Sequence, residues 1–178
     1  IVFTKVNLKK NFCLQRIKTT RKVTIPASFA RCESTGRVKN FIMAAQKNGK
    51  FCTRYPFDDT DIYKTIEGAS FSLATHPDKN LETYVDSMIT IIKNAQEPDG
   101  YLERELSHEL YNAGHLYEAA AAHYLATHKR NLLDIALKNA DLVCSVFGPG
   151  KKSVAPGHEV VEMGLVKLYR ITGKPEYL

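Results

Sequence analysis

The segment Glu105–Thr127, ELSHELYNAGHLYEAAAAHYLAT, decides the interpretation of this chain. Its residue spacing predicts one long helix with two unlike faces. One face carries polar and aromatic side chains, namely His108, Tyr111, Asn112, His115 and Glu118. The opposite face is apolar and aromatic, with Leu110, Ala113, Tyr117, Ala121 and Tyr124. A helix divided in this way packs its apolar face on neighbouring helices and lines a polar cavity with the other.

The two histidines of the polar face, His108 and His115, have two interpretations. In one, each is a buried core group whose ring bonds to a backbone carbonyl or a carboxylate. In the other, both line a cavity, and their i, i+7 spacing with Tyr, Asn and Glu on the same face favours it. The sequence alone leaves both interpretations open.

The composition is that of a soluble globular protein. The chain has 178 residues, of which 44% are hydrophobic and 25% charged, which suits one domain or part of a larger one. No apolar run approaches the roughly 20 residues of a membrane span, so we expect no membrane partner. The sequence starts at Ile1 without a leader-like stretch, so we expect that any targeting signal was removed or never included. The compartment, cytoplasm or periplasm, stays open.

Charge and cysteine content argue against two other classes. The net charge is +6, and residues 1–32 hold eight Lys and Arg but no Asp or Glu. These basic residues alternate with apolar ones and form no recognition motif, so we expect no nucleic-acid partner. The four cysteines show no metal-ligand spacing, and we expect no zinc site within this chain. They are Cys13, Cys32, Cys52 and Cys144.

The chain divides into an N-terminal arm and a helical region. The alternation within residues 1–25 predicts a short extended arm, and residues 26–178 are predicted to be all-α. Besides the helix of residues 105–127, helices are expected at Ala27–Cys32, Arg37–Gln46, Asp61–Ala74, Leu81–Gln96, Asn131–Phe147 and Glu159–Thr172.

An internal repeat indicates how these helices are arranged. The sequence LATHPDKNL (residues 73–81) recurs as LATHKRNL (residues 125–132) and more weakly at residues 169–178. A period of about 45–50 residues in a helical chain predicts stacked helical hairpins, either an open solenoid or a closed toroid. A toroid would bring Gly114-His115 and Gly157-His158 to one rim, so we favour it.

Three local patterns resemble motifs. The loop YPFDDTD (residues 55–61) is rich in carboxylates but does not match a calcium loop, so we expect Asp59 or Thr60 to cap the next helix and one carboxylate to be functional. In HELYN (residues 108–112), Asn112 replaces the second histidine of a zinc protease. The sequence GPGKKS (residues 148–153) is out of register for a phosphate-binding loop and predicts a turn.

Taken together, the motifs resemble those of glycoside hydrolase family 127, the β-L-arabinofuranosidase family. The matching stretches are VTIPA (23–27), CESTGRVKNF (32–41), YPFDDTDIYK (55–64), IEGAS (66–70), AQEPDGYL (95–102), SHELYNAGHL (107–116), FGPG (147–150) and PGH (156–158). They run through nearly the whole chain in the order of the family.

The resemblance implies an (α/α)6 barrel and retaining hydrolysis of terminal β-L-arabinofuranosyl units of plant-type glycans. An L-arabinofuranosyl oligosaccharide is then the expected partner. In the family a zinc-bound cysteine thiolate is the nucleophile and a glutamate the acid/base. These groups belong to a region of the family beyond the part matched by this chain. We therefore expect no catalytic residue and no metal ligand here, and no turnover by these residues alone.

The resemblance also assigns candidate substrate-binding residues. His108 and His158 match family histidines that bind the sugar beside the cleaved bond. His115, Asp59, Asp61 and Glu67 lie in matching motifs and are expected to line the same pocket. The chain departs from the family by its shorter length, by a short link between Leu102 and Ser107, and by the lack of Trp, with Cys13 where relatives have one.

Two other functions stay open. One is a non-catalytic helical-repeat module that binds carbohydrate or protein. The other is a different (α/α)6 sugar enzyme, such as an epimerase or an unsaturated-uronide hydrolase. Part of a ring should have an open flank, so we expect exposed apolar residues on the last helix and include a homodimer among the partners. The residues in question are Val161, Leu165, Val166 and Leu168.

Overall fold

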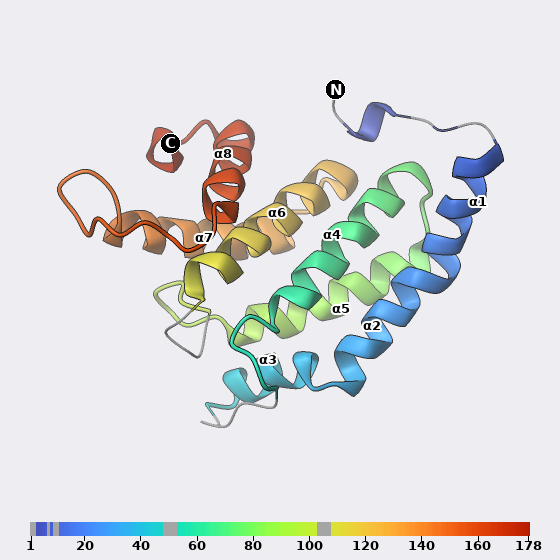
Figure 1. The fold of residues 1–178 in the computed structure, drawn as a ribbon, viewed down its shortest axis with the longest axis horizontal. Helices are drawn as coiled ribbons and strands as arrows, with labels where there is room; N and C mark the ends of the chain where they lie inside the picture. Colours follow the sequence, from blue (N-terminus) through green and yellow to red (C-terminus); the bar gives the residue numbers. More distant parts are fainter. Residues whose placement is uncertain (1–2, 7, 9–10, 48–52, 103–107) are drawn as a thin grey trace.

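The computed structural model describes residues 3–6, 8, 11–47, 53–102 and 108–178, and the regular structure within these ranges is helical (Figure 1). The predicted all-α class is therefore confirmed, and helix ends differ from prediction by only a few residues. The elements are η1 (Phe3–Lys5), α1 (Asn11–Thr19), the π-helical turn η2 (Thr20–Thr24), α2 (Ile25–Ser34), α3 (Arg37–Ala45), α4 (Thr60–Thr75), α5 (Lys79–Ala95), α6 (Glu109–Thr127), α7 (Asn131–Val146), α8 (Val160–Thr172) and η3 (Pro175–Tyr177).

The extended conformation predicted for the N-terminal arm is wrong for residues 11–24. They form α1 and η2, which continue into α2. Residues such as Leu14, Gln15 and Arg16 favour a helix, and this local preference outweighs the loose apolar alternation. Pro26 lacks the N–H that a continuous α-helix needs, and the wider π-helical turn just before it accommodates that loss. The division of the chain into an arm of residues 1–25 and a helical region of residues 26–178 stays a prediction.

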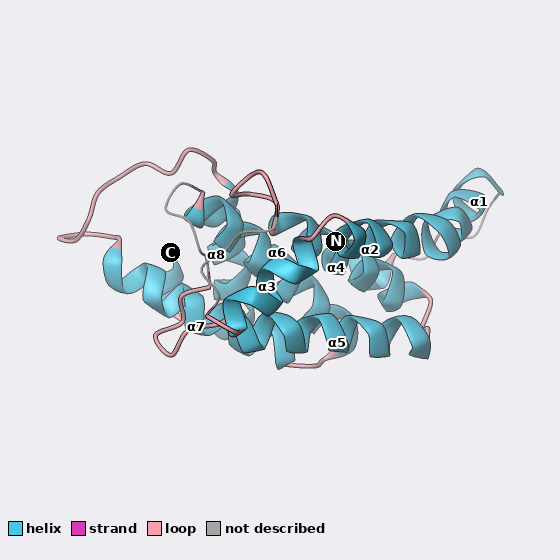
Figure 2. Cartoon of the chain, turned by 90° about the horizontal axis from the view of Figure 1, so that it is seen from below, coloured by secondary structure: helices cyan, strands magenta, loops and turns pink. Residues whose placement is uncertain are grey.

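The helices form two layers (Figure 2). One layer consists of α2, α4, α6 and α8, each in contact with the next. The second consists of α3, α5 and α7, again in contact in chain order. Each helical hairpin thus gives one helix to each layer, which is the arrangement of an arc of an (α/α)6 barrel. The predicted hairpin repeat accounts for this arrangement.

The core lies between the two layers. The largest fully buried side chains include Ile66 of α4, Ile89 of α5, Leu116 of α6 and Leu132 of α7. Burying side chains of this kind supplies about 1.5–3 kcal/mol each.

A buried polar chain crosses the core as well. The Tyr117 hydroxyl donates to Asn139 Oδ1 at 2.7 Å, and Asn139 Nδ2 donates to the Gly100 carbonyl at 3.0 Å. These buried polar side chains therefore have hydrogen-bond partners within the core.

Helices α6 and α8 approach each other at two glycines. A Cβ on Gly114 would lie 2.6 Å from the carbonyl carbon of Val160, and a Cβ on Gly164 would lie 2.8 Å from Cβ of Tyr117. Only glycine leaves room for backbones this close. The contact holds the start of α8 against the first half of α6.

The expected exposed flank of α8 is only partly present. Val161 and Leu168 are 4% and 0% exposed, so the prediction is wrong for them, because they belong to the face of α8 that packs in the core. Leu165 and Val166 are half-buried and line a cavity of about 610 Å³ with α7 and Tyr177. Among the described residues, no helix combines the length and the apolar character needed to cross a bilayer.

Candidate functional site

The starts of α4, α6 and α8 meet at one rim of the arc. Asp59 precedes α4, His108 precedes α6, and His158 lies two residues before α8. The ring centroids of Phe57 and His108 are 5.3 Å apart, which joins the loop before α4 to the start of α6. In a double ring the helices of one layer run parallel, so side chains at their first turns converge.

Tyr111 lies at the centre of the predicted histidines. Its ring centroid is 4.7 Å from that of His115, 4.7 Å from that of His158 and 6.4 Å from that of His108. The structure therefore brings the three histidines together on one side of the molecule. We call Tyr111 with His108, His115 and His158 the histidine cluster.

A hydrogen bond from the neighbouring helix fixes the Tyr111 hydroxyl. Lys64 Nζ of α4 donates to Tyr111 Oη at 2.9 Å and to Thr60 Oγ1 at 3.0 Å. The same ammonium group lies 5.1 Å from the centroid of the Tyr111 ring. The cluster is thus held by α4 as well as by α6.

Burial keeps the His115 ring neutral. It lowers the pKa of His115 to about 4, with further lowering by the charges of Lys64 and His158. A neutral imidazole donates from one nitrogen and accepts at the other. This combination suits a sugar hydroxyl, which also donates and accepts.

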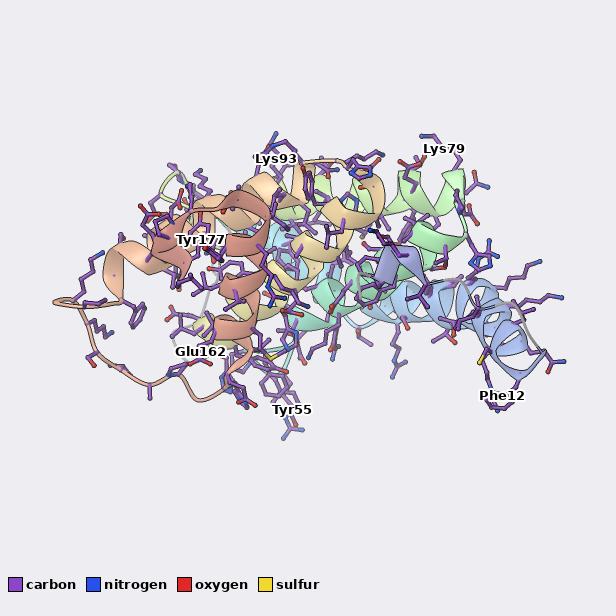
Figure 3. All side chains as sticks on the ribbon, turned by 90° about the horizontal axis from the view of Figure 1, so that it is seen from above. Phe12, Tyr55, Lys79, Lys93, Glu162 and Tyr177 are labelled. Carbon is purple, nitrogen blue, oxygen red and sulfur yellow. The ribbon has the colours of Figure 1, made fainter. Side chains whose placement is uncertain are left out.

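A cavity of about 300 Å³ opens beside the cluster. Its walls include His108, Tyr111, Phe147, Lys152, Pro156 and His158. Pockets for small ligands begin at about this size. At the edge of the rim, the stacked rings of Tyr55 and Phe57 have centroids 5.2 Å apart, and Tyr55 projects from the body of the protein (Figure 3).

Comparison with known proteins decides the family. Residues 5–178 match the sequence model described as "Beta-L-arabinofuranosidase, GH127 catalytic domain". The chain belongs to glycoside hydrolase family 127. The resemblance read from the motifs is thereby confirmed.

Individual members of the family agree. The non-reducing end beta-L-arabinofuranosidase of Bifidobacterium longum subsp. longum is 38% identical over 142 residues, which is 68% of this chain and 22% of that protein. A solved GH127 beta-arabinofuranosidase is 49% identical, with a TM-score of 0.91 over 98% of this chain and 32% of its own. The GH127 beta-L-arabinofuranosidase of Geobacillus stearothermophilus T6 is 35% identical, with a TM-score of 0.89 over 97% of this chain and 31% of its own. The chain thus spans about a fifth to a third of the length of these relatives.

The two predicted aspartates of this GH127 chain bind neighbouring side chains. Asp59 is buried and accepts from Asn40 Nδ2 at 2.9 Å, so it occupies the N-cap position of α4 without capping the helix through its side chain. The expectation that Asp59 or Thr60 caps this helix is therefore wrong. The Asp59 carboxylate binds Asn40, and Thr60 is the first helical residue, with its hydroxyl donating to the Phe57 carbonyl. Asp61 accepts a hydrogen bond from Arg37 Nε, and Nη2 of the same guanidinium group donates to Asp58 at 3.1 Å. Asp61 lines a separate cleft between α2 and α4.

Glu67 lies one turn beyond Lys64 on α4 and belongs to a second charged group. Burial raises the pKa of Glu67, and the nearby carboxylate of Glu118 raises it further. Lys167 of α8 donates to the buried carboxylate of Glu118. The Glu118–Lys167 ion pair therefore joins α6 to α8, and Glu67 of α4 lies close enough for both charges to affect its pKa.

The described residues offer no arrangement for the zinc-bound thiolate that the motif resemblance implied for the family. No group of three or more His, Cys, Asp or Glu among the described residues is arranged to hold a metal ion. Burial raises the pKa of the Cys32 and Cys144 thiols. Cys13 is exposed, and Cys52 lies outside the described residues.

Sequence reasoning missed Lys64 and Lys167 and did not single out Tyr111 as the centre of the cluster. Lys64 lies four residues after Thr60, a spacing that places both on one helix face. This spacing was visible in the sequence, but the partner of Lys64 on α6 was not. The contact of Lys167 with Glu118 likewise depends on the register of α8 against α6, which the sequence does not give.

Proposed function

We propose that this chain provides the sugar-binding wall of a glycosidase that removes terminal β-L-arabinofuranosyl residues with retention. The observation that carries the proposal is the convergence of His108, His115 and His158 around Tyr111 beside a cavity of about 300 Å³. The names of the relatives support the choice of sugar.

The imidazoles would bind the furanose through its hydroxyl groups. Neutral His115 can donate one hydrogen bond and accept another from the same sugar. The apolar ring faces of Phe57 and Tyr55 at the rim suit the C–H faces of the next sugar unit. An oligosaccharide with a terminal L-arabinofuranosyl unit is therefore the proposed ligand.

The groups that break the glycosidic bond are proposed to lie outside this chain. The longer relatives extend well beyond the part that this chain matches. We propose that the zinc, the thiolate nucleophile and the acid/base of the family belong to that remainder. The role proposed for this chain is to bind and orient the sugar. Glu67 would lie near the bound glycan without reacting, whereas Asp61 lines the separate cleft between α2 and α4.

A binding experiment tests the proposal directly. We expect methyl β-L-arabinofuranoside to shift the NMR signals of His108 and His158 in a saturable way. His108→Gln should weaken binding about tenfold. The control is His128→Asn, which should leave binding unchanged. His128 is exposed at the end of α6, and its left-handed backbone is one that Asn tolerates. Equal effects of both variants would contradict the proposal.

An activity assay separates binding from catalysis. We expect no hydrolysis of an aryl β-L-arabinofuranoside by the 178-residue chain. Zinc-dependent turnover by these residues alone would refute the division of roles.

Association between copies is a further proposal. Val154, Met163 and Leu178 are 58%, 53% and 76% exposed around the last helix. Exposed apolar groups of this kind favour self-association, and we propose a homodimer. Sedimentation at several concentrations tests it, and a monomer throughout would exclude it.

A further inference from the structure

Tyr111 is the shared contact of the histidine cluster, yet a different helix fixes its hydroxyl. We propose that Lys64 is a positioning residue of this site, whose ammonium group holds the Tyr111 ring between His115 and His158. This inference rests on the proposed sugar-binding function, because the orientation matters only if the histidines receive a sugar. Lys64 is not among the residues that line the cavity, and it reaches the site through Tyr111, which does line it.

A continuous hydrogen-bond chain supports this role. Lys64 Nζ donates to Tyr111 Oη at 2.9 Å and to Thr60 Oγ1 at 3.0 Å. The Thr60 hydroxyl in turn donates to the Phe57 carbonyl at 2.8 Å. One ammonium group therefore ties the aromatic rim loop, α4 and α6 together.

The ring contacts explain why the anchor matters. The Tyr111 ring meets His115 nearly edge-on, at 85°, and meets His158 at 49°. A swing of the Tyr111 side chain about χ1 would change both contacts at once. A charge-assisted bond at the phenol oxygen opposes that swing, because the oxygen is the side-chain atom farthest from the backbone and would move most.

The same ammonium group affects the charge of the cluster. Lys64 faces His115 from α4, and His158 faces it from the link before α8. One turn further along lie Glu67 and the Glu118–Lys167 pair. Burial is the first cause of the low pKa of His115, and the charge of Lys64 is the second. Lys64 thus favours both the position and the neutral form of the imidazole.

The test compares two lysine variants of the full 178-residue chain. Lys64→Met keeps the length of the side chain and removes its charge. Lys93→Met is the matched control, because Lys93 is an exposed lysine of α5 on the opposite side from Tyr55 (Figure 3). The ring signals of His115, assigned with His115→Gln, are followed by NMR from about pH 3 to pH 8.

We expect Lys64→Met to raise the pKa of His115 from about 4 by about one unit. The ring-current shifts of His115 and His158 should change in the same variant, since both rings contact Tyr111. Lys93→Met should leave the pKa and the shifts as they are. Identical titrations and shifts in the two lysine variants would overturn the proposal.

A second pair of variants covers a failure of Lys64→Met to fold. Tyr111→Phe keeps the ring and removes the accepting oxygen, so the His115 and His158 signals should shift or broaden. Lys64→Arg keeps the charge and the donors, so its His115 and His158 signals should match those of the unmodified chain. An unchanged spectrum in Tyr111→Phe would also overturn the proposal.

None of these measurements needs a sugar. If the titrations behave as expected and methyl β-L-arabinofuranoside does not bind, the proposed function fails while the positioning contact stands. If the sugar binds and the titrations do not change, only the role of Lys64 fails.

Discussion

Helix α6 carries two histidines with opposite surroundings. His115, near its start, is half-buried and packs against Tyr111 at an open rim. His123, near its end, is 0% exposed, and neither ring nitrogen has a hydrogen-bond partner within the described part of the chain. Burial lowers the pKa of both histidines.

A low pKa therefore does not distinguish the two ends of α6. What differs is the convergence of side chains from several elements on accessible space. At the rim, Tyr111, His115 and His158 meet beside a cavity. At the other end, Lys129 forms ion pairs with Glu82 and Asp86 close to the buried ring of His123. We expect the rim to control binding and the opposite end to control stability.

The largest effect should come from a change that disturbs the rim through its packing. Gly114→Val places a side chain where a Cβ alone would lie 2.6 Å from the Val160 carbonyl carbon. Because backbone atoms must move, we expect the free energy of unfolding to fall by about 3 kcal/mol. Urea unfolding followed by circular dichroism measures it.

A second glycine near the rim provides the control for Gly114→Val. A Cβ on Gly157 would meet no atom within 4 Å, and its φ is not positive. Gly157→Ala should therefore change the free energy of unfolding by less than about 0.5 kcal/mol. Equal losses in both variants would mean that the close approach of α6 and α8 is not what holds the rim.

A smaller loss is expected at the opposite end. Lys129 Nζ lies 2.5 Å from Glu82 Oε1 and 2.6 Å from Asp86 Oδ2. Lys129→Met leaves the two carboxylates facing each other, which should cost about 1–2 kcal/mol for this half-exposed network. Urea unfolding should show the loss, and NMR should show unchanged sugar binding. Weaker binding in this variant would mean that the two ends are coupled.

The sequence predicted the parts that depend on local pattern and repetition. The periodicity of α6 separated its polar from its apolar face, and the Gly-His pairs predicted that His115 and His158 would meet. The hairpin repeat predicted an arrangement in which helices of one layer start at the same rim. These features follow from spacing along the chain, which a reader of the sequence sees directly.

Features that depend on partners from other elements were not predictable. Asp59 looked like a helix cap until Asn40 of α3 was placed beside it. Lys64 became part of the site only through its 2.9 Å bond to Tyr111. The register between helices decides such contacts, and no spacing within one helix encodes that register.

A histidine at the rim should affect binding and leave stability unchanged. His158 is exposed and lies 4.7 Å, centroid to centroid, from Tyr111. His158→Gln should weaken binding of methyl β-L-arabinofuranoside about tenfold, which is about 1.4 kcal/mol. The midpoint of urea unfolding should stay the same. A large loss of stability with unchanged binding would reverse the roles assigned to the two ends.

The smallest effect should come from the buried histidine itself. The folded-state pKa of His123 is lowered, first by burial, so the folded state favours the neutral ring. Protonation of His123 therefore costs more free energy in the folded than in the unfolded state, so the chain loses stability as the pH falls below the ordinary pKa of about 6.5. His123→Leu removes a buried polar group without hydrogen bonds, so it should raise the free energy of unfolding by about 1 kcal/mol at pH 7. It should also reduce the loss of stability between about pH 7 and pH 5, whereas His128→Asn should do neither. Urea unfolding at both pH values measures this loss of stability. If the unmodified chain and His123→Leu lose the same amount between about pH 7 and pH 5, the acid sensitivity belongs to another group, with His115 at the rim as the first candidate.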